Sequence, residues 1–198
     1  SDSPAVIIQP ADSKQVLDAI PTAIAARKGL VVVPHRLDET QVLRNLGFDV
    51  PSPILYRYGW PGRFKPMSHQ RDTAAFLTMH KKCIVLNDMG TGKTQASLWA
   101  ADYLMSIGVV KRVLIISPLS TLNSTWGDAI FSSLYNRTYS VLHGAAEKRK
   151  KLMRDGADFC IVNHDGFEII AAEAAGMFDL IIVDEAAALR NPSTDRYK

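Results

Sequence analysis

The sequence predicts an α/β fold, with a mostly parallel sheet sandwiched by helices and a small α/β unit in front of it. From residue 67 onward, continuous apolar runs alternate with segments of helical periodicity, which is typical of buried parallel strands joined by helices. A glycine-rich loop separates one such run from a helical segment. The 198 residues, 47% of them hydrophobic and 22% charged, suffice for one well-buried domain and a small appendage.

Residues 1–60 are predicted to form the small accessory unit. One helix should bury a single apolar face and end at Gly29, because its apolar residues recur at helical spacing. That face consists of Val16, Leu17, Ile20 and Ile24. The other expected elements are strands at 6–8 and 30–33 and a helix over 38–46, closed by Gly47.

A proline-rich stretch after this unit reads as a linker, and it carries aromatic residues. Two interpretations stay open: the aromatics stack on nucleic-acid bases, or they pin the linker to the neighbouring domain. The residues concerned are Pro51, Pro53, Pro61 and Pro66, interleaved with Tyr56, Tyr58 and Trp60.

Residues 61–198 are predicted to form the main domain, in which strands and helices alternate. The expected strands are Cys83–Asn87, Arg112–Ser117, Thr138–His143, Phe159–Asn163 and Leu180–Asp184. The expected helices are Gln70–His80, Lys93–Ile107, Leu122–Leu134, Ala145–Arg154 and Gly166–Ala175.

The charge balance is mildly basic, with a net charge of +3, which permits nucleic-acid binding without requiring it. The basic run over 147–151, with Arg154 beyond it, is either a solvated helix face or a source of affinity for DNA. Cys83 and Cys160 lie in apolar runs and are expected to be reduced core residues. No apolar stretch reaches the length of a membrane span, and we expect an intracellular protein.

The residues from Asn87 to Thr94 have the composition of a phosphate-binding loop between a strand and a helix. Glycines let backbone N–H groups approach phosphates, and the helix N-terminus favours negative charge there. Lys93 would reach the β- and γ-phosphates, and the Thr94 hydroxyl would ligate Mg²⁺. Asn stands at position 87, where the strict pattern has Gly. The expected cofactors are therefore ATP and Mg²⁺.

Two acids follow the apolar run at 180–183. A carboxylate at the carboxyl end of a core strand lies where ligands bind in an open α/β sheet. Asp184 would hold Mg²⁺, and Glu185 would act as general base on the attacking water. The alternative is a helix cap at a strand end, which acids often provide, so the pair alone is a weak signal and gains its weight from the phosphate loop upstream.

Taken in order, these motifs resemble superfamily-two helicases of the Swi/Snf-like branch. The resemblance covers residues 64–198 and implies the first RecA-like motor domain of a DNA helicase or translocase. It rests on Asp88–Thr94, on Asp184–Ala187 followed by Arg190–Pro192, on Ser117–Leu122 with Trp126, on Leu142–Gly144, on Ile161–Asp165 and on His69–Gln70.

The resemblance also implies a role for each matching residue. Gln70 would read adenine; without the order of the motifs, a helix-capping role for this side chain would be an equal alternative. The other nucleotide contacts would come from Met89, Gly90, Thr91, Gly92, Lys93 and Thr94. The catalytic residues would be Lys93, Asp184 and Glu185, with Thr94 and Asp184 on the metal. A DNA track that reads no sequence would run along Pro118, Leu119, Ser120, Thr121, His143, Gly144, Asn163 and His164. For the last four of these residues, ordinary strand-to-helix turn chemistry is the alternative.

Two departures from the family pattern affect what is expected of this chain. Ala187 replaces a histidine that links the nucleotide site to the next motif. The family's third motif and its second RecA-like domain are not in the sequence, so we expect weak activity and a gap between the strands at 83–87 and 180–184. The rival interpretations are another P-loop ATPase and a nucleotide-binding module without turnover.

Overall fold

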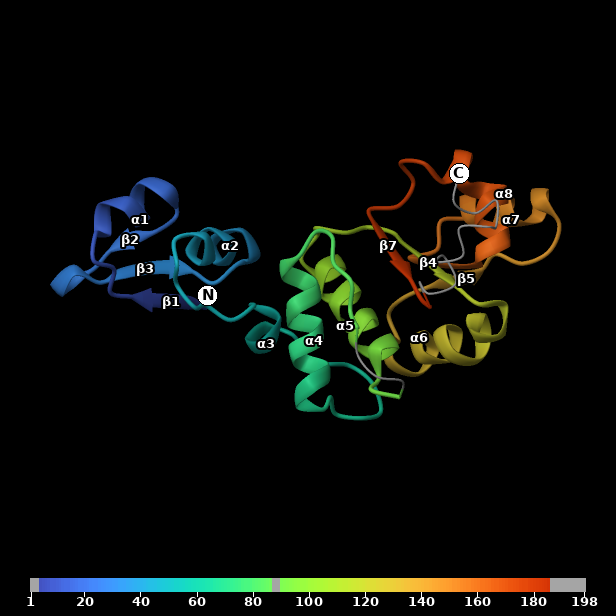
Figure 1. Ribbon diagram of the computed structural model, residues 1–198, viewed down its shortest axis with the longest axis horizontal. Helices are drawn as coiled ribbons and strands as arrows, with labels where there is room; N and C mark the ends of the chain where they lie inside the picture. The colour runs from blue at the N-terminus through green and yellow to red at the C-terminus, as the bar shows by residue number, and fades with distance from the viewer. Residues whose placement is uncertain (1–3, 87–89, 186–198) are drawn as a thin grey trace. The chain divides into compact units, whose positions relative to one another are not determined.

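The computed structural model describes residues 4–86 and 90–185, which fall into two compact units (Figure 1). Among these residues, one unit takes 4–59 and 68–86, and the other takes 60–67 and 90–185. Placing the domain boundary at residue 60 stays a prediction.

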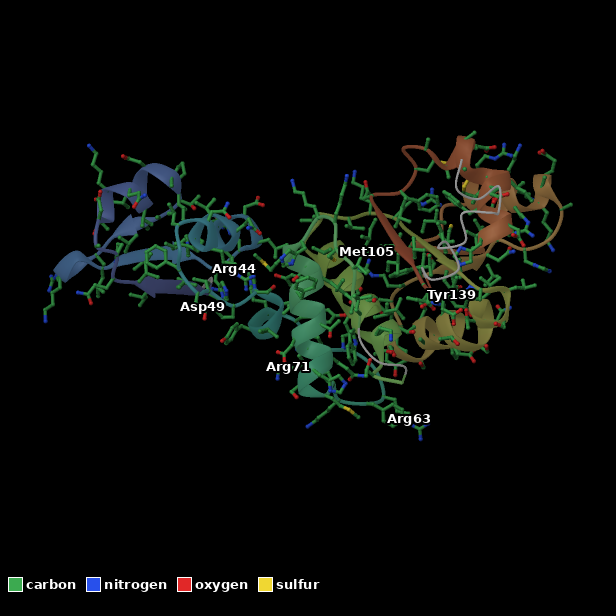
Figure 2. All side chains as sticks on the ribbon, viewed as in Figure 1. Arg44, Asp49, Arg63, Arg71, Met105 and Tyr139 are labelled. Atoms are coloured by element: carbon green, nitrogen blue, oxygen red, sulfur yellow. The ribbon has the colours of Figure 1, made fainter. Side chains whose placement is uncertain are left out.

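The first unit contains a three-stranded antiparallel sheet in the order β1 (Ala5–Ile8), β3 (Val31–Pro34), β2 (Ile24–Ala25). Two helices, α1 (Ser13–Ala19) and α2 (Leu37–Asn45), contribute to its core with the strands. The buried cluster consists of Val16, Ile20, Val31, Val33, Leu43 and Val50. Arg44, labelled in Figure 2, extends from α2, and its Nε donates to the Val50 carbonyl at 2.7 Å.

The prediction that the first helix runs to Gly29 is wrong, because the helix is shorter. It ends at Ala19, because the residue before a proline is disfavoured in the α region. Ile20 precedes Pro21 and adopts φ −128°, ψ 90°. Ile24 consequently lies in β2 and is 68% exposed, while a short 3₁₀ turn, η1, covers Arg27–Gly29.

Two further helices complete the first unit, α3 (Ile54–Arg57) and α4 (Ser68–Met79). Arg71, labelled in Figure 2, lies on α4, and its Nη2 donates to the Leu55 carbonyl at 3.1 Å. Ser52 and Thr78 share a hydroxyl hydrogen bond of 2.8 Å. The helix predicted over 70–80 is therefore confirmed as α4.

The second unit is built on a four-stranded parallel sheet in the order β5-β6-β4-β7. The strands are β4 (Val113–Ser117), β5 (Tyr139–Val141), β6 (Phe159–Asn163) and β7 (Leu180–Val183). The α-helices are α5 (Lys93–Ser106), α6 (Asp128–Ser133), α7 (Ala146–Arg154) and α8 (His164–Ala174). The predicted α/β fold with a parallel sheet and helices is confirmed, and these strands begin and end close to their expected limits.

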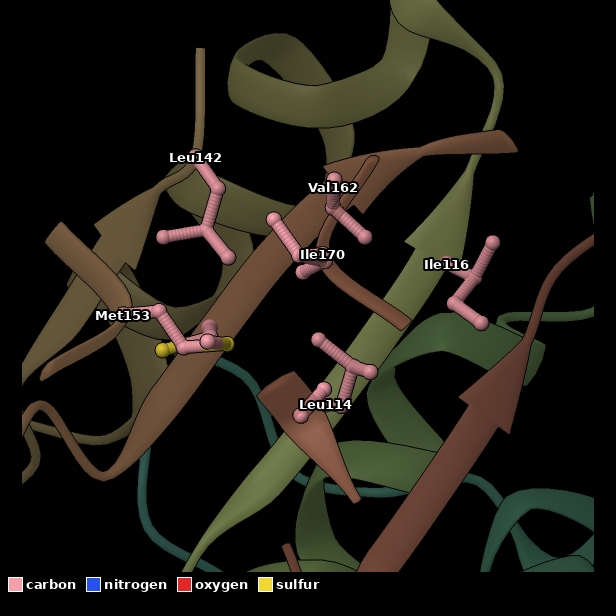
Figure 3. Packing of buried hydrophobic residues seen from close by; sticks show 8 residues of the cluster. Leu114, Ile116, Leu142, Met153, Val162 and Ile170 are labelled. Atoms are coloured by element: carbon pink, nitrogen blue, oxygen red, sulfur yellow. The ribbon is translucent and has the colours of Figure 1, made fainter. Parts of the chain in front are cut away.

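One face of this sheet is closed by a hydrophobic cluster to which α7 and α8 contribute (Figure 3). Met153 from α7 and Ile170 from α8 are fully buried in it. The strand residues in the cluster alternate along β4 and β6, as the pleat requires. They are Leu114, Ile116, Cys160 and Val162. Burial raises the pKa of the Cys160 thiol, which confirms the expectation of a core cysteine at this position.

The segment expected as one helix over 122–134 has two parts. A π-helix, η3 (Leu122–Gly127), follows a short 3₁₀ turn, η2 (Leu119–Thr121), and leads directly into α6. Trp126, on η3, is 2% exposed, and η3 packs against β5 and β6. A π-turn inside a helix often marks a functional site.

The strand predicted at Cys83–Asn87 is wrong for the residues that the structure describes there. Residues 83–86 have no regular structure, and Ile84 and Leu86 are 77% and 83% exposed. Cys83 is likewise exposed rather than buried in a core. Within the described residues β7 pairs only with β4, and an extended segment without a partner strand has no ladder to satisfy its backbone.

The proline-rich stretch is pinned at its Trp60 end. The indole of Trp60 meets that of Trp99 edge to face at 5.6 Å, and Trp99 Nε1 donates to the Pro61 carbonyl at 2.8 Å. Tyr56, in the first unit, is 68% exposed. For Trp60 the packing interpretation is therefore the one that the structure supports.

Candidate functional site

The glycine-rich loop ends at Gly92, which serves as the N-cap of α5 with φ 72°. Within the described residues Gly92 makes no side-chain capping hydrogen bond, and a helix N-terminus of this kind favours an anion. Gly90 also has a positive φ, and no heavy atom of the described residues lies within 4 Å of where its Cβ would be. Lys93 and Thr94 occupy the first turn. Met89, with Asn87 and Asp88, lies outside the described residues.

An open pocket of about 510 Å³ lies beside the start of α5. Its lining combines residues of the loop and helix with residues of η3 and α6: Gly92, Thr94, Gln95, Ser124, Thr125, Asp128, Ala129, Phe131 and Ser132. Gln95 accepts from Ser133 at 2.9 Å through Oε1, and its buried Nε2 has no hydrogen-bond partner in the described part of the chain. A glycine-bounded helix N-terminus, a threonine hydroxyl and an unpaired amide donor fit a polyphosphate with its metal.

The acidic pair follows β7, where Asp184 is held at both carboxylate oxygens. Its Oδ2 accepts from Trp126 Nε1 at 3.0 Å, and its Oδ1 accepts from the Glu185 backbone N–H at 3.0 Å. The Asp184 N–H donates to the Ile116 carbonyl at 2.8 Å, which continues the pairing of β7 with β4. Glu185 is exposed and has φ 51°, a conformation that costs a non-glycine residue about 1 kcal/mol.

Trp126 links the two halves of this site. It lies on η3, the same segment whose Ser124 and Thr125 line the pocket with Gly92 and Thr94. Its indole carries the bond to Asp184. The sequence marks Trp126 as part of a motif but gives no indication of this contact, because the two residues are 58 positions apart.

The residues predicted for the DNA track come together at the carboxyl edge of the sheet. Ser117 and Asn163 are register partners at the ends of β4 and β6, and the His143–Gly144 turn follows β5 on the other side of β6. Pro118 immediately precedes η2. In η2, the backbone N–H and the hydroxyl of Thr121 both donate hydrogen bonds to the Pro118 carbonyl, each at 3.0 Å. The exposed residues along this edge include Leu119, Ser120 and His143.

Arg149 is a residue of this edge that sequence reasoning missed. It belongs to the basic run, yet it is only 9% exposed. Its Nε donates to the Gly144 carbonyl at 2.7 Å, and its Nη1 donates to the Leu142 carbonyl at 2.9 Å and to Asn163 Oδ1 at 3.1 Å. It thereby joins the turn after β5 to the turn after β6. No periodicity distinguishes it from the lysines around it.

The rest of the basic run is divided between ion pairs and solvent. Lys150 and Arg154 both reach Glu173 on α8, at 3.9 and 3.1 Å. Lys148 and Lys151 are exposed. The basic run therefore mainly joins α7 to α8 through ion pairs, and Lys148 and Lys151 remain exposed.

Gln70 lies in the first turn of α4 and is half-buried. It belongs to the first unit, and the phosphate loop belongs to the second. Its contact with adenine therefore stays a prediction.

Comparison with known proteins gives a consistent family for this arrangement. Residues 67–197 match the family model described as DEAD/DEAH box helicase. The chain is 29% identical over 144 residues to an uncharacterized ATP-dependent helicase, YqhH, of Bacillus subtilis (strain 168), covering 68% of this chain and 24% of that protein. It is 33% identical over 129 residues to the DNA repair and recombination protein RAD54 of Oryza sativa subsp. japonica, covering 57% of this chain and 13% of that protein.

Among solved structures, the SWI2/SNF2 ATPase core of Sulfolobus solfataricus in complex with dsDNA matches with a TM-score of 0.58. The identity is 19%, and the match covers 70% of this chain and 30% of that one, so the likeness shows the fold. The chain spans less than a third of the length of each of these proteins. In the described residues, no helix is long and apolar enough to cross a membrane.

Proposed function

We propose that this chain, which belongs to the DEAD/DEAH box helicase family, is the ATP-binding motor domain of a DNA helicase or translocase. The observation that carries the proposal is the place of η3 in the site. This one segment lines the pocket at the phosphate loop and, through Trp126, holds Asp184. The two halves of a phosphoryl-transfer site are thus tied together by a single element.

Each residue of the site has a proposed role in binding ATP and Mg²⁺. When bound, ATP would supply the phosphoanhydride bond that is hydrolysed, and Mg²⁺ would neutralise part of the phosphate charge. The N–H groups at Gly90, Gly92 and the start of α5 hold phosphate oxygens, and Lys93 adds a positive charge there. Glu185 accepts a proton from the attacking water. The metal ligands are Thr94 and Asp184, and further nucleotide contacts come from Gln70, Met89 and Thr91.

DNA is the proposed partner, bound without sequence preference along the carboxyl edge of the sheet. Two relatives support this choice: one is named as a DNA repair and recombination protein, and the other was solved with dsDNA. Hydroxyls and backbone N–H groups, the kind of donor that the edge offers, contact phosphates without reading bases. We further propose that turnover requires a second RecA-like domain, and that the protein works inside a prokaryotic or phage-infected cell.

Titration with a fluorescent ATP analogue tests the nucleotide site. Lys93→Ala should lose binding and keep its thermal melting, because Lys93 supplies charge to the phosphates. Lys151→Ala is the matched control, since Lys151 is an exposed lysine on α7, and it should bind normally. Equal affinity in Lys93→Ala and the unaltered chain would remove the phosphate-loop assignment.

Fluorescence anisotropy with a labelled duplex tests the partner. Binding should be weak and should fall steeply with salt, because each phosphate contact releases counterions. ATP binding with no DNA binding at any salt concentration would favour a nucleotide-binding module or another P-loop ATPase.

A further inference from the structure

A second pocket of the second unit, of about 420 Å³, lies beside α6 and is lined by aromatic rings and arginines. The rings belong to Phe131, Tyr135 and Tyr139, and the first two side chains are 76% and 71% exposed. Arg63 and Arg137 also line the pocket, and no described lining residue is acidic (Arg63 and Tyr139 are labelled in Figure 2). Large apolar side chains that gather on an exposed surface usually mark a binding site.

This pocket lies away from the edge that carries the predicted DNA track. Tyr139 is the first residue of β5, whereas the His143–Gly144 turn follows the other end of that strand. None of the residues predicted for the track lines the pocket. It shares Phe131 and Ser132 with the pocket beside the phosphate loop, so the two pockets adjoin. A ligand bound here would therefore make contacts that the track does not supply.

Two of the rings are held on well-fixed backbone. Leu134 is buried and begins a turn that closes when the Arg137 N–H donates to the Leu134 carbonyl at 2.9 Å. Tyr135 projects from this turn. The ring of Tyr139 lies against η3, since a Cβ added at Gly127 would be 3.3 Å from its Cε2. Rings that are already positioned lose little conformational entropy when a flat ligand stacks on them.

The free positive charge at this pocket comes from Arg63. Arg137 pairs with Asp102 on α5 at 2.6 Å, which neutralises it. Arg63 is exposed and forms no ion pair within the described chain, and its guanidinium lies 5.4 Å from the centroid of the Phe64 ring. Lys65, two residues further, is exposed as well. The charge and the rings together favour a ligand that combines an anion with flat aromatic groups.

We propose that this pocket binds single-stranded DNA, with an unpaired base stacked on Tyr135 and a backbone phosphate paired with Arg63. Aromatic rings beside cations are the features with which proteins hold single strands without reading their sequence. A duplex fits poorly, because its bases cover one another's faces. The excess of positive charge favours a polyanion over a neutral protein segment. The inference rests on the proposed DNA-binding function and adds to it a single-strand contact outside the track.

Fluorescence anisotropy with three labelled probes tests the stacking. They are an oligothymidine, an abasic strand of the same length and charge, and a duplex. Tyr135→Ala should weaken oligothymidine binding about tenfold, because the support of one stacked base is lost. It should leave the affinities for the abasic strand and the duplex unchanged. Tyr135→Phe, which keeps the ring, should bind oligothymidine like the unaltered chain. Both variants alter an exposed side chain and should melt normally.

The salt dependence of oligothymidine binding tests the phosphate contact. Arg63→Gln should reduce the slope of log K against log salt by about 0.7, because one phosphate fewer is neutralised on a single strand. Lys14→Gln is the control, since it removes an exposed charge from α1 in the first unit, and it should keep the slope of the unaltered chain.

The outcomes separate this site from the proposed function. If Tyr135→Ala binds oligothymidine with the unaltered affinity while the duplex is still bound, the single-strand site is wrong, the pocket is left to a protein segment, and DNA binding stands. Equal losses of affinity for all three probes would show a general effect and would also overturn the stacking. If the unaltered chain binds none of the probes, the proposed function fails, and this inference fails with it.

Discussion

The indole Nε1 of Trp126 donates a hydrogen bond to the carboxylate Oδ2 of Asp184 at 3.0 Å. Trp126 is 2% exposed, so its donor has little access to water and its direction is fixed by packing. The other carboxylate oxygen accepts from the Glu185 N–H. The Asp184 carboxylate is therefore oriented by a hydrogen bond at each of its two oxygens, and each oxygen keeps a further lone pair as an acceptor.

Replacing Trp126 by Phe should weaken the Mg²⁺-dependent part of nucleotide binding. The phenyl ring keeps most of the packing and loses the N–H, at a cost of about 1 kcal/mol in the free energy of unfolding. We expect lower affinity for a fluorescent ATP analogue with Mg²⁺ and unchanged affinity without it. Trp99→Phe is a matched control, because Trp99 is also 2% exposed and donates elsewhere, to the Pro61 carbonyl. An equal loss in both variants would show a general packing effect.

Replacing Glu185 by Gln should slow hydrolysis and leave binding intact. The amide keeps the shape of the carboxylate and cannot accept the proton, and a general base contributes about 10²–10⁴-fold. Single-turnover hydrolysis should be measured in a form of the protein that carries both proposed motor domains. Glu173→Gln, which alters an acid in the α7–α8 ion pairs, is the control. A rate near that of the unaltered protein would exclude Glu185 as the base.

Asp179 should make the stability depend on pH at acid values. Its Oδ2 accepts from the backbone N–H groups of Lys111 at 2.8 Å and Arg112 at 3.1 Å, and these bonds lower the pKa of the Asp179 carboxyl. A lowered pKa in the folded state means that the stabilisation is present above the unfolded-state pKa and is lost as pH falls through the folded-state pKa.

Asp179→Ala should therefore lower Tm at neutral pH, and its Tm should converge on that of the unaltered chain as the pH falls below the folded-state pKa. Thermal melts across an acid titration would show this. Asp155→Ala, at an exposed acid just after α7, should give no such convergence. A Tm difference between the two proteins that stays constant with pH would mean that the charge of the Asp179 carboxylate does not contribute to stability.

Met153→Ala should destabilise the second unit strongly. Met153 is fully buried in the cluster between α7, α8 and the sheet, so its loss leaves a cavity (Figure 3). The expected cost is about 2–5 kcal/mol in denaturant unfolding. Met67→Ala makes the same change at a side chain that is 63% exposed and should stay within about 0.5 kcal/mol. Similar midpoints for the two variants would contradict the packing described here.

The sequence predicted the sheet well where strands are buried on both faces. β4 and β6 are continuous apolar runs and lie where expected, because no other element buries such a run so completely. The run at 83–86 has the same composition and forms no strand among the described residues. A strand is stable only when a neighbouring strand pairs with its backbone, and local composition does not indicate whether such a neighbour is present.

The residue types of the candidate site can be named from the sequence, but most of its contacts cannot. Gly92, Lys93, Thr94 and Asp184 could be named because their spacing is local and their chemistry is specific. Arg149 could not be distinguished from the lysines beside it, since its role depends on carbonyls brought close by the sheet. The bond between Trp126 and Asp184 likewise depends on packing that no local pattern encodes.

The π-helix at Leu122–Gly127 makes this segment sensitive to length as well as to composition. Its turn holds one residue more than an α-helical turn, and each residue of a helix rotates the next by about 100°. Deleting one residue before Trp126 would restore ordinary winding and swing the indole away from Asp184. Surface segments normally tolerate insertions and deletions, but here a single lost codon would disconnect the acid from its donor, even with every side chain of the site retained.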